Sequence, residues 1–191
     1  MNCNKLQAIL AAAAVGCLTA CRPAAETSSV VTPEYDKQTG RLSRLTHDSS
    51  GNGKPDTVAV MDGNHVVRVE ADEDENGTVD RWEYYTSSGQ ATPGQAPDVL
   101  EHVERATRRD GHINRWEFFE NGKLVRVKED TDGNGKVDKW EQYTDGTLTE
   151  MALDTVGRGT PDRKLVYNPE GGFDHIEVDK DGSGHFERLK P

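Results

Sequence analysis

The sequence predicts an all-β protein built from one repeated strand-turn-strand unit. A unit of about 24 residues occurs six times, and apolar residues return at the same two positions in every copy. Turn-forming Asp, Asn and Gly interrupt the chain every few residues. Short apolar segments separated by such residues are typical of antiparallel hairpins. We therefore expect an antiparallel meander of about a dozen strands that forms an elongated or curled sheet.

Each unit is located by the first residue of an acidic loop, and we number these loops one to six along the chain. The first residues are Asp48, Asp72, Ala106, Asp130, Asp154 and Asp179. Their spacings are 24, 34, 24, 24 and 25 residues. The long interval carries an insert at 86–98 that is rich in Gly, Pro, Ser and Gln, which predicts an enlarged surface loop rather than a new domain.

The apolar positions lie six and three residues before each loop. They are Leu42/Leu45, Val66/Val69, Leu100/Val103, Leu124/Val127, Leu148/Met151 and Phe173/Ile176. Loops two, three and four are followed by Trp82, Trp116 and Trp140, each with a glutamate directly after it. Because so few apolar side chains belong to each unit, the core has to form where neighbouring units stack.

The apolar spacing of three residues would also suit one turn of a helix, so the turn residues have to decide between helix and strand. Asn121-Gly122 and Asp145-Gly146 separate segments rich in Val, Trp, Tyr and Thr. A helix interrupted so often by glycine would not nucleate, whereas these dipeptides favour two-residue hairpins. The segments are therefore predicted to be strands, and the repeat domain is predicted to span 35–191.

The first twenty residues have the three parts of a secretory signal. One lysine precedes a 13-residue apolar stretch from Leu6 to Leu18, and small residues follow before Cys21. The stretch is too short for a membrane-spanning helix, so 1–20 is predicted to be a removable signal peptide. The small, polar, proline-containing residues that follow predict a flexible tether over 21–34.

Leu18-Thr19-Ala20-Cys21 resembles the lipobox of bacterial lipoproteins. The resemblance implies cleavage before Cys21 and attachment of acyl chains, palmitate among them, to that residue, which would anchor the chain to a membrane of the bacterial cell envelope. Arg22, in place of an aspartate, favours the outer membrane over the inner one by the same resemblance. The alternative is an ordinary secretory signal that happens to end at a cysteine.

The acidic loops are predicted calcium sites, because Ca²⁺ takes six to eight oxygen ligands and prefers carboxylates and carbonyls. Loops two and four match the twelve-residue EF-hand loop, with ligands at positions one, three, five, seven, nine and twelve. Loop four offers Asp130, Asp132, Asn134, Lys136, Asp138 and Glu141; loop two offers Asp72, Asp74, Asn76, Thr78, Asp80 and Glu83. Loop six offers a weaker set, Asp179, Asp181, Ser183 and Glu187. Position seven would contribute its backbone carbonyl.

The spacing of 24 residues leaves no room for the paired helices of an EF-hand. The loops more closely resemble the calcium loops found between β-strands, as in FG-GAP blades, and the hairpin context loosely resembles MORN-type repeats. Loop three departs from the pattern because it has lost two acids; Arg108 is expected to replace the ion there by pairing with Asp110 or Glu117. The alternative to calcium is that all six loops are structural turns, since Asp, Asn and Gly favour turns for backbone reasons alone.

Composition narrows the function. The chain carries 34 acidic against 23 basic residues and a net charge of −11, so nucleic acid is not an expected partner. The sequence shows no assembled set of catalytic residues, and we do not expect this protein to be an enzyme. The leading hypothesis is a calcium-binding, lipid-anchored binding or scaffold module at the cell surface or in the periplasm. The alternatives are a metal-free β-repeat that binds a protein or glycan and, more remotely, a glycan-acting hydrolase.

Overall fold

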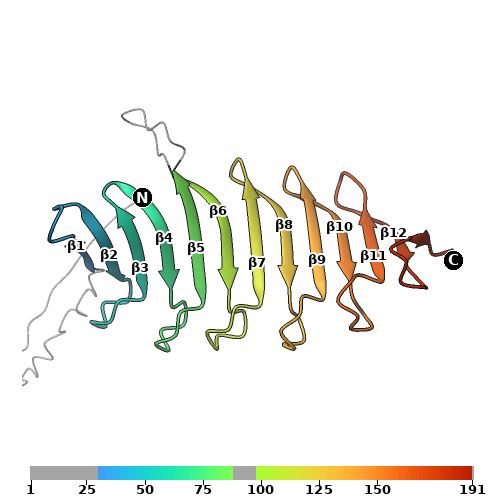
Figure 1. Cartoon of the computed structure of the whole chain (residues 1–191), viewed down its shortest axis with the longest axis horizontal. Helices are drawn as coiled ribbons and strands as arrows, with labels where there is room; N and C mark the ends of the chain where they lie inside the picture. Colours follow the sequence, from blue (N-terminus) through green and yellow to red (C-terminus); the bar gives the residue numbers. More distant parts are fainter. Residues whose placement is uncertain (1–29, 88–97, 191) are drawn as a thin grey trace, which may run out of the picture.

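The computed structural model describes residues 30–87 and 98–190 as one open antiparallel sheet (Figure 1). Its thirteen strands follow one another in sequence order, so each strand pairs with its neighbours along the chain. The strands are β1 (Val30–Tyr35), β2 (Leu42–Asp48), β3 (Thr57–Asp62), β4 (His65–Ala71), β5 (Arg81–Ser87), β6 (Asp98–Arg105), β7 (Arg115–Glu120), β8 (Lys123–Glu129), β9 (Lys139–Thr144), β10 (Thr147–Leu153), β11 (Arg163–Tyr167), β12 (Phe173–Val178) and β13 (Glu187–Arg188). The predicted all-β meander is confirmed.

The two edges of the sheet differ because two kinds of turn alternate. All six acidic loops lie along one edge, the lower one in Figure 1, and the short turns between β3 and β4, β7 and β8, and β9 and β10 lie along the other. Asn121-Gly122 and Asp145-Gly146 form the predicted two-residue turns, and all four residues have positive φ. Two consecutive positive φ angles match the twist of a tight hairpin, which explains why Asn-Gly and Asp-Gly occur there.

The sheet begins earlier than the sequence analysis placed it. Strand β1 starts at Val30, inside the segment assigned to the tether, and pairs with β2 from Val30↔Asp48 onward. All six of its side chains are exposed, so no pattern of buried residues marks it in the sequence. The signal peptide, Cys21 and the rest of the tether lie outside the described residues, as does 88–97 of the predicted insert.

The interior of this single-layered sheet is thin. The buried apolar residues of the described part are Ala71, Val103, Ala106, Val127 and Ala152. Val127 is completely buried, although it lies on one face of one layer. Long side chains on neighbouring strands must therefore provide much of the cover that a second layer provides in a sandwich.

A connected set of ion pairs provides this cover. Arg115 donates to Glu117 at 2.7 Å and to Glu129 at 3.0 Å, and Lys139 donates to Glu141 at 2.8 Å and to Glu129 at 3.2 Å. These residues face the same side as Val127, because strand residues alternate between faces and the register is continuous across β7, β8 and β9. The network joins β7, β8 and β9 through their side chains. Within the described ranges, no helix has the length and apolar character required to cross a membrane.

Candidate metal centre

The acidic loops share one backbone frame, which is set by hydrogen bonds at loop positions one and nine. In loop two, the N–H of Asp80 at position nine donates to the carbonyl of Ala71, the residue before position one, and closes the loop. The N–H of Asp72 at position one donates to the carbonyl of Asp56, which is position nine of loop one. The same two bonds form in loop four, through Asp138 and Asp130. Loops two and four are thus each closed on themselves and attached to the loop before them.

Left-handed backbone recurs at positions four and six of every loop. Position six is glycine throughout, with φ between 75° and 92°, whereas position four includes Glu75 and Arg109, both with φ of 57°. The left-handed conformation at position four was not predicted from the sequence. A glycine at position four in the other loops was the available signal, because glycine adopts this region without steric cost.

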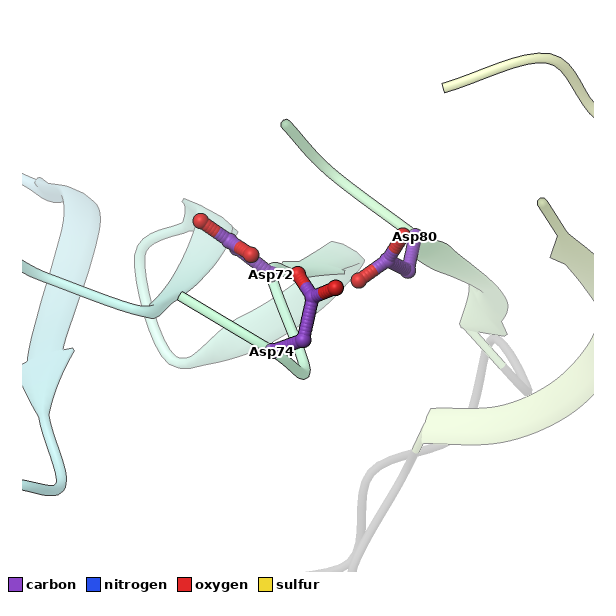
Figure 2. A group of neighbouring side chains, drawn as sticks. All are labelled: Asp72, Asp74 and Asp80. Atoms are coloured by element: carbon purple, nitrogen blue, oxygen red, sulfur yellow. The ribbon is translucent and has the colours of Figure 1, made fainter. Parts of the chain in front are cut away.

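Within this frame, positions one, three and nine come together. Asp72, Asp74 and Asp80 each place a carboxylate oxygen within 4.8 Å of the others, and so do Asp130, Asp132 and Asp138. Figure 2 shows the first group, with the carboxylate of Asp74 directed toward that of Asp80. Three carboxylates at such distances repel one another unless a cation or hydrogen bonds compensate them. Both groups could hold a metal ion.

Position one is held mainly by backbone amides. Asp130 accepts hydrogen bonds from the N–H groups of Gly133 at 2.7 Å and Gly135 at 2.8 Å, one on each carboxylate oxygen. Burial raises the pKa of Asp130, but these donors outweigh burial, and its pKa is lower than usual. The carboxylate therefore stays ionised and fixed in orientation. Asp72 is held in the same way by Asn76 and Gly77.

The asparagine at position five forms a side-chain hydrogen bond to the backbone of its own loop. The side-chain oxygen of Asn76 accepts from the N–H of Thr78 at 2.8 Å, and that of Asn134 accepts from the N–H of Lys136, also at 2.8 Å. These bonds hold Thr78 and Lys136 at position seven, whose carbonyls were the predicted ligands. The amides thus shape the turn directly beside the aspartates.

The glutamates at position twelve lie apart from these groups. Since each loop closes at position nine, Glu83 and Glu141 belong to strands β5 and β9. Glu83 lies 2.8 Å from Arg81, and Glu141 lies 2.8 Å from Lys139. Tyr85 and Tyr143 donate to these two glutamates at 2.6 and 2.8 Å. The structure therefore gives both glutamates partners on the sheet face.

Loop six differs because a cation from loop five occupies it. Arg158 lies 2.9 Å from Oδ2 of Asp179, whose side chain is 2% exposed. Asp181 accepts from the N–H of Ser183, and Glu187 lies 3.7 Å from Lys180. Among the described residues, the clusters of three potential ligands lie in loops two and four.

Loop three supplies cations to both of its neighbours. Arg109 lies 3.7 Å from Asp74 and 3.8 Å from Asp80 in loop two. Arg108 donates to the carbonyls of Thr131 at 2.9 Å and Asp130 at 3.4 Å in loop four. The predicted pairing of Arg108 with Asp110 or Glu117 is therefore replaced by contacts to the next loop. These contacts between repeats were not visible from a single repeat.

Known proteins give no family for this chain. No protein-family model matches it, and a search of curated proteins finds no match. The function is therefore inferred from the geometry of the loops and from the sequence.

Proposed function

We propose that this chain is a calcium-binding β-repeat protein of the bacterial cell envelope, anchored by lipid on Cys21 and acting as a binding or scaffold module. The observation that carries the proposal is the gathering of three aspartates at positions one, three and nine in each of loops two and four. Hard oxygen ligands of this kind suit Ca²⁺, and a flexible Asp- and Gly-rich loop accommodates its irregular coordination.

The donor set supports a metal at loop two in particular. Asp80 is 3% exposed, and its Oδ1 atom is buried without a hydrogen-bond partner. A buried carboxylate oxygen left without a partner costs free energy, and a cation coordinated by that oxygen would remove the cost. When bound, the ion would supply positive charge and hold the loop edge rigid. Asp72, Asp74 and Asp80 would hold it, with the carbonyl of Thr78 near the same turn.

Thermal melting of the full-length chain in millimolar calcium and in chelator tests the proposal. Calcium at a hundred times its Kd adds about 2.7 kcal/mol per site, which corresponds to a rise of about 5–10 °C for a chain of this size. We expect the rise to disappear when Asp72, Asp74, Asp130 and Asp132 are all replaced by Asn, and magnesium to give a smaller shift. Identical melting in calcium and chelator would contradict the calcium function.

The membrane anchor has a separate test. Mass spectrometry of the protein isolated from bacterial membranes is expected to show cleavage before Cys21 and acyl chains on that residue. Cys21→Ser is expected to remove the acyl mass and release the protein from the membrane fraction. Retention of an uncleaved and unmodified chain would contradict the anchor while leaving the calcium function standing.

A second candidate function is glycan binding by the tryptophan-bearing face. Trp82, Trp116 and Trp140 share one row of the sheet, because Trp82 pairs with Glu104, Glu104 with Trp116, Trp116 with Lys128, and Lys128 with Trp140. A parallel row stacks Tyr84 on His102 with a ring separation of 4.3 Å. Half-buried aromatic rings beside polar side chains can stack against sugar rings.

The glutamate after each tryptophan lies on the opposite face, because adjacent strand residues alternate. We therefore assign a binding role to this face and no catalytic residue. Tryptophan fluorescence during titration with soluble glycan fragments tests it. Binding is expected to weaken in Trp116→Ala and to persist in chelator; an unchanged fluorescence signal across the fragments would contradict the glycan role.

A further inference from the structure

We propose that loop two is the tighter of the two calcium sites, and that the residue at loop position two decides which loop is tighter. This proposal rests on the calcium function proposed above and makes it specific. It follows from a side-chain pairing between positions two and nine that recurs along the edge of the sheet and that loop two lacks.

In four of the six loops, a hydroxyl residue at position two satisfies the side chain at position nine. Ser49 donates to Asp56 through both its N–H and its Oγ, at 2.7 and 2.6 Å. Thr155 donates to Asp162 in the same manner, at 2.7 and 2.8 Å. The remaining two pairs are Thr107 with Asn114 and Thr131 with Asp138. A serine or threonine at position two therefore satisfies the hydrogen-bonding capacity of the side chain at position nine from within the same loop.

Loop two has a glutamate, Glu73, at position two. Its backbone N–H still donates to Oδ2 of Asp80 at 3.1 Å, but it has no hydroxyl to offer. The Glu73 carboxylate instead lies 3.2 Å from Arg81 and 3.4 Å from Arg105. As a result, Oδ1 of Asp80 is buried and without a partner. In loop two, two acids occupy the positions where loops one, three, four and five place a hydroxyl donor and its acceptor.

Loop four provides the comparison, since it carries the same three aspartates. Both oxygens of Asp138 already accept hydrogen bonds from Thr131, from its N–H at 3.0 Å and from its Oγ1 at 2.9 Å. A cation entering loop four competes with these bonds, whereas a cation entering loop two meets an oxygen that forms none. Since an unsatisfied buried oxygen raises the free energy of the empty site, the gain on binding is larger at loop two.

Arg109 is a cation that the chain itself holds beside loop two. Its guanidinium lies 3.7 Å from Asp74 and 3.8 Å from Asp80, distances too long for hydrogen bonds, and its side chain is 47% exposed. It therefore reduces the repulsion between the two carboxylates without satisfying Oδ1 of Asp80. A calcium ion bound there must displace this charge or share the site with it, so Arg109 is expected to weaken calcium binding.

Calorimetric titration of the full-length chain with calcium chloride tests the proposal in two backgrounds. One background disables loop four with Asp130→Asn and Asp132→Asn, and the other disables loop two with Asp72→Asn and Asp74→Asn. We expect the tighter site to remain in the first background and to be lost in the second. Loss of the tighter site in the first background would overturn the proposal, although calcium binding itself would stand.

The role of position two is tested in the background with loop four disabled. Glu73→Thr introduces the hydroxyl found in four of the other loops, and it is expected to weaken calcium binding about tenfold relative to Glu73→Gln. Glu73→Gln is the matched control, because it removes the same charge without supplying a hydroxyl close to the backbone. Equal affinities for these two variants would overturn the role of position two.

Two further variants keep the proposal testable if Glu73→Thr fails to fold. Arg109→Gln is expected to tighten loop two about threefold, and Thr131→Val is expected to tighten loop four in the background with loop two disabled. Unchanged affinity in both would overturn the proposal. Absence of any calcium heat from the unsubstituted chain would instead refute the calcium function on which the proposal rests.

Discussion

Tyr143 donates a 2.8 Å hydrogen bond to Glu141, the residue that the loop pattern places at the last calcium-ligand position. Glu141 also lies 2.8 Å from Lys139 and is 5% exposed. A ligand at position twelve of an EF-hand is free to close over the ion, whereas this glutamate is held on the sheet face by two neighbours on its own strand. These contacts indicate that Glu141 contributes to packing on the sheet face rather than to calcium binding.

Replacing Glu141 with Gln is therefore expected to lower the stability of the fold and leave calcium affinity unchanged. The expected loss is about 1.5–3 kcal/mol, because Lys139 loses a charged acceptor in a largely buried setting. Urea unfolding in chelator measures the loss, and calorimetry measures the affinity. Glu120→Gln, at an exposed position on β7, is the control and is expected to change neither quantity. A marked loss of calcium affinity in Glu141→Gln would restore this residue as a ligand.

The same contacts predict how stability falls in acid. Burial raises the pKa of Glu141, but the hydrogen bonds from Lys139 and Tyr143 outweigh burial, and its pKa in the folded protein is below the usual value. A carboxyl group with a lowered pKa stabilises the fold above the pKa of the unfolded state, and this contribution is lost as the pH falls through the folded pKa. The stability difference between the unsubstituted chain and Glu141→Gln is thus expected to shrink below about pH 4. A difference that is constant with pH would contradict this.

In alkali, Tyr85 and Tyr143, which each donate to a glutamate on their own strand, are expected to titrate late. Burial and the hydrogen bond to the neighbouring glutamate raise the pKa of Tyr85 and Tyr143 to about 12. A raised pKa stabilises the fold below the unfolded value of about 10, and that stabilisation is lost as the pH rises from there through the folded pKa. Ultraviolet absorbance of the phenolates measures the titration. Tyr143→Phe should remove one late step, and an early step in its place would contradict the assignment.

The sequence allowed the repeat and the hairpins to be predicted because both depend on local chemistry. Asn121-Gly122 needs only its own backbone preference to specify a tight turn, and the aspartates at positions one, three and nine meet because one closed loop holds them. Strand β1 could not be predicted in this way, since its side chains are exposed and only its backbone pairs with β2.

Contacts between neighbouring loops also could not be predicted from the sequence of a single repeat. Arg108, Arg109 and Arg158 all act on a loop other than their own, and the distance between loops follows from strand pairing rather than from sequence spacing. The pairing between positions two and nine is different, because Ser49, Thr107, Thr131 and Thr155 occupy the same place in the repeat. The recurrence of Ser or Thr at position two was visible in the sequence, but its role became clear only from the hydrogen bonds in the structure.

The thin interior predicts that single buried aliphatic residues carry much of the stability. Val127 is completely buried, and Val127→Ala is expected to cost about 2–3 kcal/mol from lost burial and the cavity left behind. Val67, on β4, is 45% exposed, so Val67→Ala serves as the matched control with an effect below about 0.5 kcal/mol. Thermal melting in chelator compares the two. Equal effects would show that the face around Val127 is not packed as described.

The last prediction concerns loop six, where Arg158 occupies the place that the sequence pattern gives to an ion. Arg158 donates to the Asp179 carboxylate at 2.9 Å and to its carbonyl at 3.3 Å, and the aspartate is almost completely buried. Arg158→Gln is expected to cost about 1.5–3 kcal/mol, because the buried carboxylate of Asp179 loses its ionic partner. The loss should appear equally in calcium and in chelator, since loop six is expected to take no ion while Arg158 is present.

Arg163→Gln is the matched control for this variant. Arg163 lies 3.6 Å from Asp162, but its side chain is 56% exposed, and an exposed pair of this kind contributes about 0–1 kcal/mol. If Arg158→Gln destabilised the protein in chelator and calcium then restored its stability, loop six would be a latent metal site from which the arginine excludes the ion. If both variants melted like the unsubstituted chain, the pair between Arg158 and Asp179 would contribute nothing, and loop six would depend on its backbone hydrogen bonds alone.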